Sequence, residues 1–148
     1  MKTEVLQDIV FEHLIGAQIA LERDGFLTPL IIIVNDMDEV RLQPVVIETD
    51  EDIETLNELL HKFSEISQSL VLIVNAYQLT ISNEDTRPVD LTEHPDARQY
   101  IHCFLYTKEE TIIRRMPYTD TDGRYLFHDL GWETIVEHYA EYKNPFFK

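Results

Sequence analysis

The chain has 148 residues, of which 44% are hydrophobic, which is enough to bury a core in one domain of ordinary size. Its formal net charge is −16, from 28 acidic and 12 basic residues. This charge argues against direct binding to nucleic-acid phosphates or to an anionic membrane surface, because both ligands need a basic face. A basic protein partner is compatible with it.

The residue types exclude several kinds of site. Cys103 is the only cysteine, so the chain can form neither an intramolecular disulfide nor a thiolate zinc cage. The 4 glycines are isolated, so no glycine-rich phosphate loop exists. We find no signal-peptide pattern and no apolar run of membrane-spanning length, and we expect a cytoplasmic protein without a cofactor or a bound metal.

A long helix is predicted over residues 3–24, where apolar side chains recur at helical spacing. Gly25 stands at the position of a C-terminal cap, and Pro29 prevents continuation. Gly16 and Ala17 inside the helix suggest close approach of another backbone, either within the fold or across a dimer contact.

Two runs of five apolar residues, 30–34 and 70–74, predict central strands that are covered on both faces. Beyond the second run the pattern alternates as far as Ser82, which predicts a strand that emerges towards an edge. Residues 40–48 predict a returning strand, and Pro44 places it at an edge or a bulge.

A second helix follows Thr49 and Asp50, either of which can cap its start. Residues 83–96 predict a long polar loop, and strands are then expected over 99–107, 110–119 and 124–130, the last after a hairpin turn. A third helix is predicted over 132–140. The closing segment with Phe146 and Phe147 is either a strap folded onto the core or an anchor for another chain.

The predicted order is helix, two strands, helix, three or four strands, helix. It indicates a single α+β domain over residues 1–148, with 143–148 as a C-terminal tail. We expect a mainly antiparallel sheet of five or six strands with helices on both faces. A sandwich of the profilin or roadblock type has the same order, but an order of elements carries no function.

Residues 70–77, the loop containing His94, Pro95 and Asp96, and the strand meander after it resemble a loose group of uncharacterised bacterial and phage-encoded proteins. The likeness covers residues 28–130. It departs from the group at Asn75 and Tyr77, where an acidic residue and a tryptophan are expected. The resemblance implies a prokaryotic or phage setting and no activity.

Acidic residues are concentrated between Asp36 and Glu65, a segment with ten carboxylates and two basic residues. The carboxylates at the start of the second helix also favour the positive end of its dipole, so a solvated helix start is one interpretation. The other is a docking face for a basic partner, with the binding residues Asp50, Glu51, Asp52, Glu54 and Glu58. On that basis we expect a non-enzymatic interaction factor that docks on or inhibits a basic, nucleic-acid-binding protein, in its strongest form by mimicking phosphate charge.

Two alternatives stay open. A small-molecule-binding protein or enzyme would place a pocket beside residues 70–82, bordered by Asn75, Tyr77 and His102. A homodimer would pair through the first helix or a sheet edge.

Other polar residues have simpler interpretations. The acidic turns at 36–39 and 120–123 are expected to be ordinary turns rather than cation sites. His102 and Cys103 are neighbours on a strand, so they should point to opposite faces. Arg114 and Arg115 should do the same, one buried against a carboxylate and the other solvated.

Overall fold

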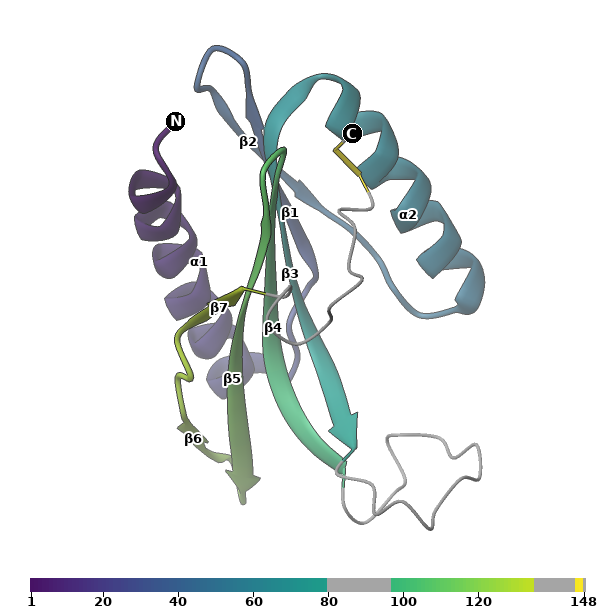
Figure 1. The fold of residues 1–148 in the computed structure, drawn as a ribbon. Helices are drawn as coiled ribbons and strands as arrows, with labels where there is room; N and C mark the ends of the chain where they lie inside the picture. Colours follow the sequence, from purple (N-terminus) through teal and green to yellow (C-terminus); the bar gives the residue numbers. More distant parts are fainter. Residues whose placement is uncertain (80–96, 135–145, 148) are drawn as a thin grey trace, which may run out of the picture.

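The computed structural model describes residues 1–79, 97–134, 146 and 147. This part of the chain forms two helices and seven strands (Figure 1). In order they are α1 (Thr3–Asp24), β1 (Leu30–Asn35), β2 (Val40–Pro44), α2 (Asp50–Glu65), β3 (Ser67–Leu79), β4 (Ala97–Thr107), β5 (Thr111–Thr121), β6 (Arg124–Phe127) and β7 (Trp132–Thr134).

All strand pairs are antiparallel, and the sheet has the order β2-β1-β3-β4-β5-β6, with β7 also paired to β5. The α+β class with a mainly antiparallel sheet is therefore confirmed. The described sheet has seven strands rather than five or six, because the segment predicted as a third helix begins as β7. The rest of that predicted helix, and the predicted loop at 83–96, lie outside the described residues.

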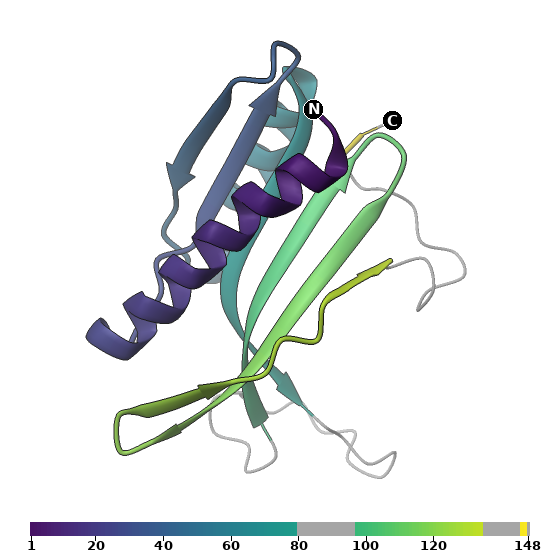
Figure 2. The same cartoon turned by 90° about the vertical axis from the view of Figure 1, so that its left-hand side faces the viewer.

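The two helices cover opposite faces of the sheet (Figures 1 and 2). In β1 the side chains of Ile32 and Val34 belong to the core under α1, whereas those of Ile31 and Ile33 belong to the core under α2. All four are buried. The continuous apolar run is thus explained by burial on both faces, as predicted.

β3 is the central strand, and its two halves have different neighbours. It pairs with β1 as far as Ile73, and it pairs with β4 up to Leu79. The described pairing on the β1 side therefore ends halfway along β3. This agrees with the prediction of a strand that emerges towards an edge.

The predicted helix end and hairpin are also present. Gly25 caps α1 with φ of 76°, and its N–H donates to Leu21 O. Asp122 and Gly123 both have positive φ, 53° and 82°, at the turn between β5 and β6. Close approach of another backbone to Gly16 is not found within the described part of the fold, because a Cβ built on Gly16 would meet no atom within 4 Å. The alternative, a dimer contact at this position, stays a prediction.

Phe146 and Phe147 are buried in the core on the α2 face of the sheet. The Phe146 ring meets the rings of Tyr106 and His61, with centroids 4.8 and 4.9 Å away. For these two residues, the structure supports the strap rather than the exposed anchor.

Candidate interaction surfaces

The start of α2 is held by a reciprocal cap. Thr49 Oγ1 accepts a hydrogen bond from the Asp52 N–H at 3.2 Å, and Asp52 Oδ2 accepts from the N–H groups of Glu48 and Thr49. These bonds, led by the one from Glu48, lower the pKa of Asp52. Asp52, one of the five carboxylates predicted to bind a partner, therefore stabilises the start of α2.

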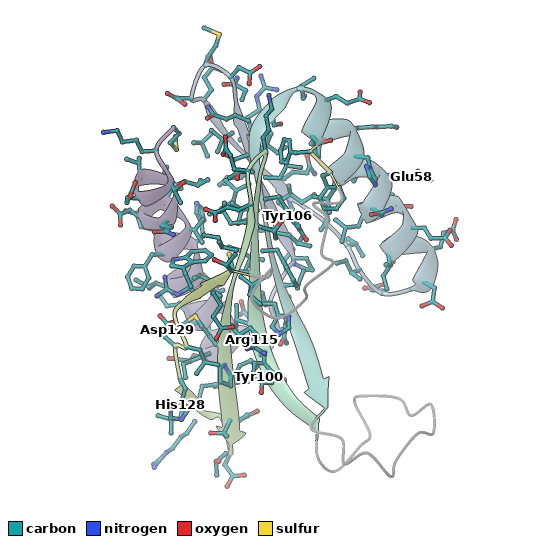
Figure 3. All side chains as sticks on the ribbon, in the orientation of Figure 1. Glu58, Tyr100, Tyr106, Arg115, His128 and Asp129 are labelled. Atoms are coloured by element: carbon teal, nitrogen blue, oxygen red, sulfur yellow. The ribbon has the colours of Figure 1, made fainter. Side chains whose placement is uncertain are left out.

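The other four, Asp50, Glu51, Glu54 and Glu58, are exposed. Glu51, Glu54, Glu58 and Glu65 follow a spacing of three, four and seven residues, which places them on one side of a helix. We call these four glutamates the α2 row. Figure 3 shows Glu58 on the side of α2 that faces away from the sheet. None of the four takes part in an ion pair within the described part of the chain.

The acidic turn between β1 and β2 lies near the C-terminal end of α2, because Asn35 pairs with Ser67, two residues after Glu65. Asn35 Oδ1 accepts hydrogen bonds from the N–H groups of Met37 and Glu39, and Asp38 adopts a positive φ of 62°. Figure 1 shows this turn at the top and the start of α2 at the lower right. Because α2 is about 24 Å long, the sequence segment rich in carboxylates is spread over two ends of the molecule.

The described residues contain no group of three or more acidic, histidine or cysteine side chains that could hold a metal ion. In the turn between β5 and β6, Asp120 Oδ1 accepts from the Gly123 N–H at 3.0 Å. Asp120 therefore stabilises the turn. Both acidic turns behave as ordinary turns in the structure.

The predicted pocket residues do not converge. Asn75 lies on the α1 face, where the Tyr118 hydroxyl donates towards its Oδ1 at 2.9 Å. His102 lies on the α2 face, with its ring between those of Tyr100 and Phe104. The pairing of Asn75 with Ile101, one position before His102, explains this result, because successive residues of β4 alternate between faces. The side chain of Tyr77 lies outside the described residues.

His102 and Cys103 point to opposite faces, as predicted. Burial lowers the pKa of His102, and the nearby Arg115 charge lowers it further. Among the residues that the structure describes, the buried His102 Nε2 has no hydrogen-bond partner. Burial raises the pKa of the Cys103 thiol well above its ordinary value, so Cys103 is an inert core residue.

The two arginines of β5 also point to opposite faces, but both are paired. Arg114 forms a two-pronged ion pair with Asp129 on the α1 side, and its guanidinium lies over the rings of Phe11 and Trp132. Arg115, labelled in Figure 3, lies on the other face and pairs with Glu133 at 3.0 Å. The expectation that the second arginine is solvated is wrong, because β7 brings Glu133 beside it.

The sequence patterns did not reveal a second surface, on the outer side of α1. Val5, Phe11, Ile15 and Ile19 are all exposed there. Beside them is a groove of about 290 Å³ between α1 and the start of β1. The sequence did contain a signal for this surface: Phe11, Ile15 and Ile19 are apolar, follow i, i+4 spacing and lie outside the predicted buried stripe.

Comparison with protein families, with curated proteins and with solved structures found no match to this chain. No helix in the described residues is long and apolar enough to cross a membrane.

Proposed function

We propose that this chain binds a basic protein through the α2 row. The observation that carries the proposal is the series of exposed glutamates along one side of the helix, none of which forms an ion pair with another described residue. Successive members are about 4.5, 6 and 10.5 Å apart along the axis. Lys62 is the only lysine or arginine in α2, and its side chain is also exposed.

The net charge of −16 supports the same proposal. A strongly negative molecule attracts a basic partner over distances of the Debye length, about 10 Å at 0.1 M salt, and this attraction accelerates encounter. Carboxylates at the rim of an interface contribute more to the association rate and to specificity than to affinity. The binding should therefore weaken steeply as salt is added.

The test is affinity capture from a prokaryotic lysate at low and at moderate salt. The variant is Glu51→Gln, Glu54→Gln, Glu58→Gln, which removes the charges without placing cations at the positive end of the helix dipole. The control is Asp36→Asn, Glu39→Gln, Glu109→Gln, which has the same net charge but leaves α2 intact. All six side chains are exposed in the structure.

We expect a basic protein to be retained by the original chain and by the control at low salt, and to be lost by the α2 variant. Equal loss with both triple variants would mean that net charge alone governs the capture. Equal retention by all three proteins would refute a role for the α2 row.

A further inference from the structure

The outer side of α1 carries four large apolar side chains although it faces solvent. Val5, Phe11, Ile15 and Ile19 are between 41% and 54% exposed. The last three are spaced i, i+4 and i+8, so they form one ridge about 12 Å long. The sheet side of the same helix is already filled by buried residues: Leu6, Val10, Leu14, Ala17 and Leu21. In Figure 2 this outer side of α1 faces the viewer.

The groove next to this ridge is lined mainly by small or apolar residues. Its lining includes His13, Gly16, Ala17, Ala20, Phe26 and Ile73. Gly16 has open space where a side chain would project, and Phe26 is 62% exposed at the groove. Gly16 lies three positions before Ile19, so the C-terminal end of the ridge borders the groove, whereas Phe11 lies at the Arg114 guanidinium on the other side of the helix. A volume of about 290 Å³ has room for one large apolar side chain.

Carboxylates accompany the ridge. Glu4, Asp8, Glu12 and Glu22 are exposed and form no ion pair within the described part of the chain. Arg23, which also lines the groove, is engaged by Asp24 at 2.9 Å. Asp8, Glu12, Ile15, Ile19 and Glu22 are spaced by three or four residues, so acidic and apolar side chains share the outer side of the helix.

We propose that the outer side of α1 is a second docking surface, which binds an amphipathic helix from a partner protein. The partner helix would carry large aliphatic residues at three- and four-residue spacing and lysine or arginine residues on its flanks. A ridge of i, i+4 side chains packs into the complementary groove of another helix, and helix binding through such anchors is a common recognition mode. The basic flanks would face Asp8, Glu12 and Glu22.

The carboxylates of α1 favour a basic partner helix at this surface over a second copy of the chain. Two α1 surfaces packed together would bring carboxylates against carboxylates, between two molecules of net charge −16. The surface also differs from the α2 row, whose glutamates have no large apolar side chains between them and which lies on the other face of the sheet. The proposal for the α1 surface and the proposal for the α2 row can therefore be confirmed or refuted independently of each other.

The test uses the full chain and three synthetic helical peptides of about five turns. The first has leucine on one face and lysine on the flanks, the second keeps the leucine face and has glutamate flanks, and the third has the same composition as the first in scrambled order. Fluorescence anisotropy at about 0.1 M salt reports binding. We expect the leucine–lysine peptide to bind at least about tenfold more tightly than either of the others.

Two variants locate the binding on α1. Ile15→Gln, Ile19→Gln should weaken the leucine–lysine peptide about tenfold or more, since two apolar contacts are lost. Gly16→Leu should fill the groove and weaken binding while keeping the helix, because the site of its Cβ is open. The matched control is Ile53→Gln, Ile66→Gln, which changes two exposed isoleucines at α2. The variant Glu51→Gln, Glu54→Gln, Glu58→Gln should keep most of its affinity for the leucine–lysine peptide.

Three results would overturn the proposal. One is the absence of binding by the leucine–lysine peptide. Another is equal affinity of that peptide for the original chain and for both α1 variants. The third is a concentration-dependent dimer in light scattering that Ile15→Gln, Ile19→Gln abolishes, because the surface would then belong to a second copy.

Discussion

The hydroxyl group of Tyr118 on β5 reaches across β4 to Asn75 on β3, with 2.9 Å between Tyr118 Oη and Asn75 Oδ1. The same hydroxyl lies 2.7 Å from Gln99 Oε1 on the intervening strand. Tyr118 is only 5% exposed, so these polar atoms meet within the core under α1. Asn75, a residue predicted to line a pocket, is thereby part of a contact that connects three strands.

A double-mutant cycle should detect this contact. Tyr118→Phe should lower the free energy of unfolding by about 1 kcal/mol, because the partly buried Asn75 Oδ1 loses its donor. Asn75→Ala should have an effect of similar size, and the double variant should lose less than the sum of the two. Urea unfolding monitored by circular dichroism provides the values. Strict additivity would show that the two side chains are not coupled.

The cap of α2 makes a second prediction. Thr49→Ala removes the oxygen that accepts the Asp52 N–H and should lower the free energy of unfolding by about 1 kcal/mol. Thr55→Ala is the matched control, because Thr55 is exposed within the same helix and alanine favours helices. Thermal or urea unfolding of the two variants gives the comparison. A Thr49→Ala protein as stable as the control would contradict the role of this cap.

Acid should weaken the pair between Arg114 and Asp129. The hydrogen bonds from Arg114 keep the pKa of Asp129 below its ordinary value, although partial burial opposes this shift. The contribution of Asp129 to stability is therefore present above the unfolded-state pKa of about 4, and it is lost as the pH falls through the lower folded-state pKa.

The measurement is the difference in unfolding free energy between the original chain and Asp129→Asn as a function of pH. We expect a constant difference near neutral pH and a shrinking one below about pH 4. Glu109→Gln, at an exposed position, controls for the loss of one charge. A difference that persists unchanged in acid would exclude the ionised pair as its source.

His102 should make the protein sensitive to milder acid. Its folded-state pKa is lowered by burial and by Arg115, so the unfolded chain takes up a proton near pH 6.5 that the folded chain does not. The stability of the original chain should decrease as the pH falls through that value, and the loss should end below the folded-state pKa. His102→Phe removes this proton linkage and the unpartnered Nε2 atom.

We therefore expect His102→Phe to lose less stability than the original chain between about pH 7 and pH 5. Denaturant unfolding at these two pH values measures the effect. His128→Gln is the control, because His128 is exposed. Identical losses in the original chain and in His102→Phe would assign the acid sensitivity to other groups.

Local patterns determined the class of this fold and most of its elements. The five-residue apolar runs identified β1 and β3 because a strand that is apolar at every position must be covered on both faces. The end of α1 was predicted from Gly25 and the start of α2 from Thr49, because the backbone preference of glycine and the side-chain preference of threonine act over a few residues. The edge position of β2 followed from Pro44.

Only the tertiary structure decided which side chains meet. Alternation along β4 separated His102 from Asn75, and pairing of β7 with β5 brought Glu133 to Arg115. The exposed apolar ridge of α1 was also not predicted, because helical spacing identifies the buried stripe but does not show whether apolar residues on the other side of the helix are covered. Backbone preferences act locally, whereas strand register and the choice of the covered helix face depend on contacts between residues far apart in the chain.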